Sequence, residues 1–247
     1  MRDSLENIRE NFKKNIGIVE KLMKFDEVIQ IICLNALEKA NKGLEHFDCG
    51  DHTLYNIKPI IQMMKNIRIN ASVRPSYEIM LNQCVVLLVS YFSSSIDDLF
   101  QVALDNKIKT KNLGKLEKEE IKLSFGQLAY DDDIVNLFMS KKDINFQDMQ
   151  SISRVFEEYI GIVAIPKDKT VNNIILSQSC RHCIVHDGST VNKKISNYLS
   201  IAKPRDLKPD LKVDDKILFD ENEIKIIIDS MLKYIDLLIE KILALSH

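Results

Sequence analysis

Apolar residues recur at helical spacing along most of the chain. In residues 4–44 they lie three or four positions apart, which predicts one long helix or two helices with a kink. These apolar positions are Leu5, Ile8, Phe12, Val19, Leu22, Val28, Ile29, Ile32 and Leu37. The next segment, 45–56, has the composition of a loop. A second helix is expected over roughly 58–69, because Pro59 suits the first turn of a helix.

The most apolar part of the chain follows Pro75. A strong helix is predicted from Tyr77 to about Asn106, and its middle reads CVVLLVSYFSSSIDDLF. Because that middle is apolar on nearly every side, we expect this helix at the centre of a helical bundle. Residues 107–146 are rich in lysine and aspartate and are interpreted as a polar surface insert with short helical runs.

Two longer helices and a shorter one are predicted after the insert. Residues 147–161 form an amphipathic pattern that stops at Gly161. A helix from about Val171 to Asp187 follows, with Thr170 as its N-cap and Gly188 as the left-handed residue that ends it. A shorter helix is expected over 191–200.

The C-terminal region begins with a connector punctuated by prolines, AKPRDLKPDLKVDDK. Asp220 and Glu223 then form a capping-box pattern that opens the last helix. Polar residues recur at three and four positions along that helix, which leaves a wide apolar face. The expected fold class is therefore all-α, a helical bundle in one domain. Its parts are N-terminal helices in 1–70, a core in 77–106 and 147–200, the insert 107–146 and the C-terminal helix 221–247.

The amino-acid composition limits the classes of protein to which this chain can belong. The chain has 247 residues, of which 45% are hydrophobic and 28% charged, the balance of a soluble globular protein. Seven glycines and five prolines are too few for a turn-rich β sandwich or barrel. The formal net charge of −2 argues against a wholly basic surface that coats nucleic acid, so any contact with RNA must be local.

The cysteines and the apolar runs predict the cellular compartment of the protein. Five cysteines are an odd number in apolar surroundings, which favours reduced, buried thiols over a disulfide framework. They are Cys33, Cys49, Cys84, Cys180 and Cys183. The charged N-terminus lacks the apolar region of a signal peptide, and the longest uninterrupted apolar run, CVVLLV, is short of a bilayer span. We expect a cytoplasmic protein with no membrane partner.

One short segment, SQSCRHCIVHDG at 177–188, gathers residues that are rare elsewhere. The chain contains seven arginines and five histidines, and three of these twelve lie here: Arg181, His182 and His186. On a helix, an apolar stripe is formed by Leu176, Cys180, Cys183 and Ile184, and a second stripe by Ser179, His182 and His186. Arg181 lies about 140° round the helix from His186, at about 100° per residue. A site shared with a second copy across a two-fold axis would bring both groups together.

These residues carry a resemblance to a known family. Arg181, four intervening residues and His186 match the R-x4-H signature of the HEPN superfamily of α-helical domains, and His182 fits the polar residue favoured after the arginine. The wider phrase RHCIVHDGSTVNKK resembles the branches of that family found in abortive-infection and toxin-type proteins. The segment SYFSSSIDDLF is similar to the family's other central helix.

The resemblance implies an endoribonuclease that uses no metal and no cofactor. RNA would be cleaved by attack of the ribose 2′-hydroxyl on the adjacent phosphate, with His186 moving protons and Arg181 holding phosphate charge. His182 would make a secondary polar contact, and Ser179 and Asp187 would support the imidazole by hydrogen bonding. The resemblance also implies a homodimer with the active site at its interface, a toxin or phage-defence role, and an antitoxin or other regulatory protein as a partner.

Other interpretations of the same residues stay open. Arginine and histidine favour the C-terminal end of a helix through its macrodipole, so the cluster can be a polar helix end alone. A HEPN-type domain can also be a non-catalytic module that binds a nucleotide or a protein. A zinc site is a third interpretation. Its ligands would be Cys180, Cys183 and His186, together with a second set in His46, Cys49 and His52.

Overall fold

The computed structural model is built from helices, which confirms the all-α prediction. It describes residues 1–44, 57–69, 74–120, 134–163 and 167–245. Over these ranges the β structure is limited to an isolated antiparallel bridge between Thr190 and Lys216. The predicted loop at 45–56 lies outside the described residues.

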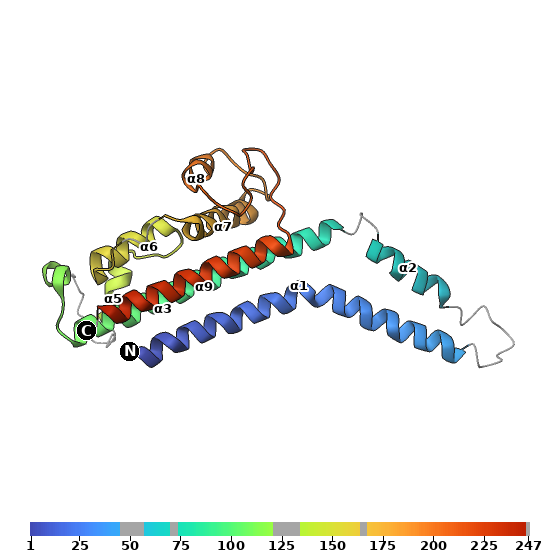
Figure 1. Ribbon diagram of the computed structural model, residues 1–247, viewed down its shortest axis with the longest axis horizontal. Helices are drawn as coiled ribbons and strands as arrows, with labels where there is room; N and C mark the ends of the chain where they lie inside the picture. Colours follow the sequence, from blue (N-terminus) through green and yellow to red (C-terminus); the bar gives the residue numbers. More distant parts are fainter. Residues whose placement is uncertain (45–56, 70–73, 121–133, 164–166, 246–247) are drawn as a thin grey trace.

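Helix α3 (Arg74–Lys109) is the centre of the bundle, as its apolar sequence predicts. It contacts α1 (Arg2–Leu44), α7 (Lys169–His186) and α9 (Glu221–Ala244), which run beside it in Figure 1. Aromatic rings join three of these helices. The ring centroid of Phe92 on α3 is 6.4 Å from that of Phe12 on α1 and 5.8 Å from that of Tyr234 on α9. Such edge-to-face pairs add to the burial of large apolar surfaces.

The length and apolarity of α3 raise the question of whether this helix could cross a membrane. Its segment Ile79–Lys109 is long and apolar enough to cross a membrane by length and composition, although no uninterrupted apolar run within it approaches a span. The core helix of a soluble protein meets the same criterion. The contacts of α3 with helices on several sides are those of a core helix.

The interpretation of 107–146 as a surface insert is wrong for its last part. Helix α5 (Ile134–Lys141) and the residues after it belong to the core, since Phe138 and Phe146 are each 5% exposed. The ring of Phe146 lies 5.4 Å from that of Phe100 on α3. Lysine and aspartate dominate the composition of the segment and conceal these apolar anchors. The 3-10 turn η1 (Gly114–Lys118) contains no buried residue, as a surface insert would.

Helix α6 (Met149–Val155) continues directly into a π-helical turn, η2 (Phe156–Ile160). It is capped at its start by Asp148, whose carboxylate accepts from the amides of Gln150 and Ser151. The chain leaves the helix at Gly161, where φ is +86°, a conformation that glycine adopts without strain. The predicted end at Gly161 is therefore confirmed.

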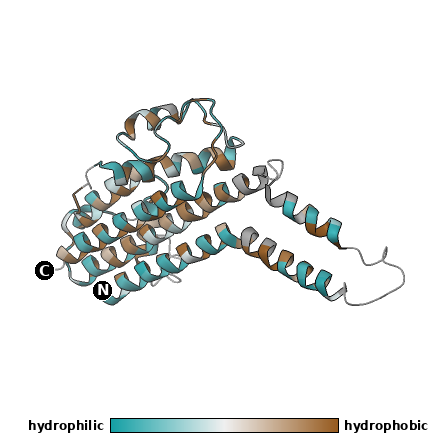
Figure 2. Ribbon diagram, turned by 45° about the vertical axis from the view of Figure 1, so that its right-hand side comes forward, coloured by the Kyte–Doolittle hydropathy of each residue, from teal (hydrophilic) through white to brown (hydrophobic). Residues whose placement is uncertain are grey.

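The second half of α1 leaves the bundle together with α2 (Lys58–Ile69), and the two form a projecting arm (Figure 1). Both the single continuous helix and the predicted α2 are confirmed. Several apolar side chains on the arm are exposed, and Figure 2 shows hydrophobic colouring along it. They include Phe25, Val28, Ile31, Ile32, Ile60 and Met63. The apolar positions of the second half of α1 thus have a helical period without the burial that the period suggests.

The start of α9 has the predicted capping box. The amide of Glu223 donates to the Asp220 carboxylate at 2.8 Å, and the amide of Asp220 donates to the Glu223 carboxylate at 3.0 Å. Between α7 and α9 lie helix α8 (Ser196–Ile201) and an irregular connector, which Figure 1 shows together beside the end of α7. Helix α8 is shorter than the predicted 191–200.

Candidate active site at the end of helix α7

Helix α7, which carries the arginine and both histidines, begins earlier than predicted. Its N-cap is Asp168, whose carboxylate accepts from the amide of Val171 at 2.9 Å. Thr170 lies inside the helix, so its prediction as the N-cap is wrong. Asp168 is the stronger capping residue because a carboxylate also complements the positive end of the helix dipole.

The first part of α7, residues 171–180, is buried at every position. Its polar side chains bond to the structure around them. The Asn173 amide nitrogen donates to Ser230 Oγ at 3.2 Å, and its oxygen accepts from the amides of Asp206 and Leu207 at 3.1 Å each. Asn172 donates to the carbonyl of Pro204 at 2.9 Å. These bonds hold α7 to both α9 and the connector.

The apolar stripe predicted on α7 faces the core. Leu176, Cys180 and Cys183 are each 1% exposed or less. Burial raises the pKa of the Cys180 thiol to about 12 and also raises that of Cys183. A thiol with so little thiolate at neutral pH is neither a good nucleophile nor a ready metal ligand, so these two cysteines are part of the core.

The last turns of α7 leave the core and present the candidate reacting groups to solvent. His182 and His186 are exposed and Arg181 is half-buried. The two imidazole rings lie one turn apart with their centroids 4.9 Å from each other, tilted by 48°. In the described part of the chain, no hydrogen bond or ion pair engages the Arg181 guanidinium or either imidazole. These three side chains are therefore open to a ligand or to another chain.

Within the described part of the chain, Ser179 and Asp187 bond to groups other than the imidazole that the resemblance implies as their partner. The Ser179 hydroxyl is buried and donates to the carbonyl of Ile175 at 2.9 Å, one turn back along the helix. The Asp187 carboxylate accepts from the Asn192 amide at 2.7 Å. Both side chains bond to other groups of the protein, and neither bonds to an imidazole of the described residues. Asp187 fixes the loop that follows the helix.

The end of α7 is closed as predicted. Gly188 has φ of +60°, the left-handed conformation expected of it, and Ser189 also has a positive φ of +62°. The amide of Ser189 donates to the carbonyl of Cys183 at 3.1 Å, so one of the last carbonyls of the helix has a partner. This turn directs the chain away immediately after His186 and leaves the imidazole uncovered.

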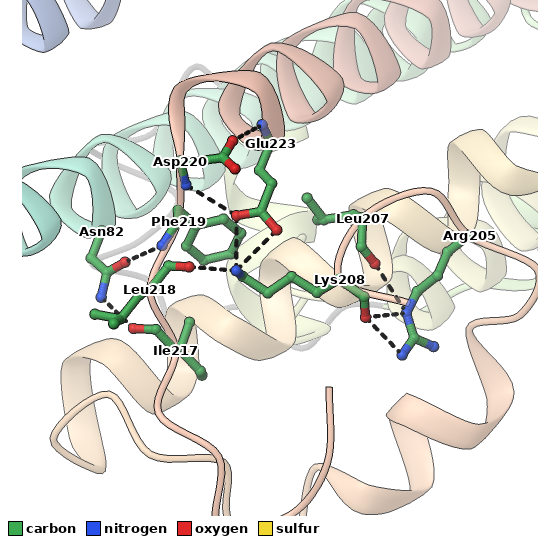
Figure 3. A network of polar contacts seen from close by, with 9 residues as sticks. All are labelled: Asn82, Arg205, Leu207, Lys208, Ile217, Leu218, Phe219, Asp220 and Glu223. Carbon is green, nitrogen blue, oxygen red and sulfur yellow. Dashed lines mark hydrogen bonds and ion pairs between the residues drawn. The ribbon is translucent and has the colours of Figure 1, made fainter. Parts of the chain in front are cut away.

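A polar network fixes the connector that flanks α7 (Figure 3). The buried guanidinium of Arg205 donates to the backbone carbonyls of Leu207 and Lys208, as Figure 3 shows. It also donates to the carbonyls of Leu199 and Ala202 at 2.8 and 2.9 Å. The Lys208 ammonium forms an ion pair with Glu223 at 2.8 Å and lies 4.5 Å from the centre of the Phe219 ring. The capping box of α9 is thus joined to the connector through Glu223.

Asn82 extends this network to α3. Its amide nitrogen donates to the carbonyl of Ile217 at 2.8 Å, and its oxygen accepts from the amide of Phe219 at 3.1 Å (Figure 3). Buried polar groups that are fully bonded restrict a segment to one arrangement. The connector therefore forms a fixed wall beside the end of α7 although it has little regular structure.

A cavity of about 270 Å³ opens between α6, α7 and α8, next to the two histidines. Its polar lining residues include Gln178, His182, Lys194 and Tyr198, but neither Arg181 nor His186. Sequence reasoning missed Gln178, Lys194 and Tyr198. The position of Gln178 did carry a signal, since it lies four residues before His182 on the same face of the helix.

The described residues contain no group of three histidine, cysteine, aspartate or glutamate side chains that could hold a metal ion. Cys180 and Cys183 are directed into the core, whereas His186 is exposed. The second ligand set of the zinc interpretation, His46, Cys49 and His52, lies outside the described residues.

Comparison with protein-family models, with curated proteins and with solved structures gave no match to this chain. The resemblance to the HEPN superfamily therefore rests on the motif at 181–186 and on the segments around it.

Proposed function

We propose that this chain is a metal-independent endoribonuclease whose active site is shared between two copies of the chain. The observation that carries the proposal is that the half-buried Arg181 and the exposed His186 have no partner in the described part of the chain, at the end of a helix whose buried asparagine and serine side chains are bonded. The R-x4-H spacing of these two residues supports the same proposal. A cytoplasmic toxin or phage-defence role, with an antitoxin or other regulatory partner, is proposed from the resemblance.

The reaction needs only groups that the chain supplies. One imidazole, that of His186, accepts the proton of the ribose 2′-hydroxyl as the 2′-oxygen attacks the adjacent phosphorus. The bond from phosphorus to the 5′-oxygen breaks, and the leaving oxygen takes a proton from His186 of the second copy. Arg181 donates to the phosphate oxygens, whose negative charge it stabilises in the transition state. The products are a 2′,3′-cyclic phosphate and a 5′-hydroxyl.

Two copies are needed because of helix geometry. Residues five positions apart diverge by about 140° on one helix, so Arg181 and His186 of the same chain cannot readily meet one phosphate. Two α7 ends facing each other across a two-fold axis would place each arginine near the partner's histidine. The exposed Lys193 and Lys194, which have no carboxylate partner in the described part of the chain, add positive charge for RNA.

The test is cleavage of single-stranded RNA by the purified chain in EDTA. We expect cutting that leaves 2′,3′-cyclic phosphate ends, and a loss of about 100-fold or more for Arg181→Ala and for His186→Ala. Lys216→Ala, which removes an exposed cation from the connector, is the matched control and should cut at the wild-type rate. Activity that requires a divalent metal, or equal activity in all of these variants, contradicts the proposal.

A second candidate is a non-catalytic module that binds a nucleotide or a protein. The cavity beside His182 favours it, because a cavity lined by Lys194, which has no ion-pair partner in the described part of the chain, can hold a ligand without any chemistry. This candidate predicts binding of RNA or nucleotides with no cleavage in the same assay.

A further inference from the structure

One residue that lines the cavity between α6, α7 and α8 has a buried hydrogen-bond donor for which the described part of the chain supplies no acceptor. Gln178 lines the cavity and is 8% exposed. Its amide oxygen accepts from the backbone amide of Met149 at 3.1 Å, which fixes the orientation of the side chain. The amide nitrogen is buried and has no partner among the described residues. A buried donor of this kind costs free energy unless a ligand supplies an acceptor.

The rest of the lining suits a flat, partly apolar ring. Ile175, Ile195 and Ile201 provide apolar walls, and Tyr198 adds an aromatic side chain on which a ring can stack. Tyr198 and Lys194 are exposed and belong to the short segment after the α7 turn. The volume of about 270 Å³ admits one small ring system and not a nucleic-acid helix.

Two charged residues, Lys194 and Asp148, line this cavity together with His182. The Asp148 carboxylate accepts from the amides of Gln150 and Ser151, whereas the Lys194 ammonium has no ion-pair partner in the described ranges. The His182 ring, which lines the cavity, has its centroid 4.9 Å from that of the His186 ring, so the cavity is adjacent to the proposed reacting groups. A ligand with a planar ring and an attached phosphate would match this combination of apolar side chains, an amide donor and a lysine ammonium.

We infer that this cavity holds one nucleobase of the RNA, with the phosphate of that nucleotide at Lys194. The choice of RNA rests on the proposed function. Because the Gln178 nitrogen can only donate, the base must present an acceptor to it, either a keto oxygen or an unprotonated ring nitrogen. In the present form that nitrogen is closed off from solvent, so binding involves a small shift of the side chains that cover it. The cavity thereby selects the nucleotide next to the cleaved bond.

The test uses the full wild-type chain and the four ribonucleoside 5′-monophosphates, with binding followed by calorimetry. These ligands contain no phosphodiester bond, so binding is measured independently of cleavage. At least one nucleotide should bind saturably, whereas ribose 5-phosphate, which lacks a base, should not. Lys194→Ala should weaken binding about tenfold, because a charged hydrogen bond to phosphate is lost. Lys193→Ala is the matched control, since Lys193 is equally exposed but does not line the cavity.

Two further variants test the cavity itself. Gln178→Glu keeps an acceptor for the Met149 amide but removes the donor, and binding should be lost. Ile201→Trp fills the cavity from its exposed edge, where folding is not at risk, and binding should again be lost. The inference is overturned if no nucleotide binds saturably, if ribose 5-phosphate binds as well, if Ile201→Trp binds like the wild type, or if both lysine variants weaken binding equally.

The outcomes separate this inference from the proposed function. Nucleotide binding without RNA cleavage would leave the cavity assigned and favour the non-catalytic candidate. Cleavage without nucleotide binding would leave the ribonuclease proposal intact and overturn the base cavity alone.

Discussion

The two parts of helix α7 use polar residues in opposite ways. In 171–180 every residue is buried, and asparagine and serine side chains bond to neighbouring helices, to the connector or to the helix backbone. In 181–186 an arginine and two histidines reach solvent and have no partner in the described part of the chain. A bonded polar residue in the core serves the fold, whereas a group left open is available for binding or catalysis. Gln178 combines features of both parts. Its amide oxygen accepts from the Met149 amide, whereas its buried amide nitrogen has no partner among the described residues.

The largest expected effect of burial in the first part of α7 is on thiol reactivity. Burial raises the pKa of Cys180 from 9.0 to about 12, so its thiolate fraction at pH 7 is about a thousandfold below that of an ordinary thiol. We expect Cys180 to resist iodoacetamide in the folded protein while the half-buried Cys33 reacts. Mass spectrometry of labelled peptides measures both. Equal labelling of the two would mean that the first part of α7 opens readily.

A smaller effect is expected on stability. Asn173→Ala removes the bond to Ser230 and leaves two connector amides without their acceptor. We expect the free energy of unfolding to fall by about 2–4 kcal/mol, measured by urea unfolding. Asn197→Ala, on the exposed side of α8, is the control and should change it by less than about 0.5 kcal/mol. If the two variants unfold alike, the buried polar bonds of α7 do not hold the fold.

The smallest stability effect is predicted at the exposed end of α7. Arg181→Ala and His186→Ala should each change the free energy of unfolding by about 0.5 kcal/mol or less, because neither side chain has a hydrogen bond or ion pair to lose among the described residues. Circular dichroism during urea unfolding measures this change. A loss of several kcal/mol in either variant would assign that side chain to the fold and support the interpretation as a structural helix end.

Much of the fold was predictable because burial repeats with the helical period. The central position of α3, the capping box at Asp220 and the turn at Gly188 follow from local patterns. The role of Phe146 did not, because one aromatic residue in a lysine-rich segment has no periodic signal. In the arm of α1 the apolar residues do recur with the helical period, yet several of them are exposed. Whether a periodic apolar face is buried depends on which other elements pack against it.

The sequence alone pointed to Arg181 and His186 as site residues, but it did not predict the cavity beside them. Arg181 and His186 are visible in the sequence because such residues are rare in this chain. The cavity was not, since Lys194 and Tyr198 meet Gln178 only after the chain turns at Gly188 and returns as α8. The partners of Ser179 and Asp187 were also hidden, because the choice between an imidazole and a nearby backbone or amide group depends on three-dimensional geometry.

The central claim is that the open end of α7 performs 2′-hydroxyl chemistry on RNA. It is tested most directly with a DNA strand that contains a single ribonucleotide, incubated with the wild-type chain in EDTA. The account predicts one cut, at the bond 3′ of the ribonucleotide, with a 2′,3′-cyclic phosphate on the upstream fragment and no cut in the all-DNA strand. Cutting of the all-DNA strand, or failure to cut both this substrate and all-RNA strands, would contradict it.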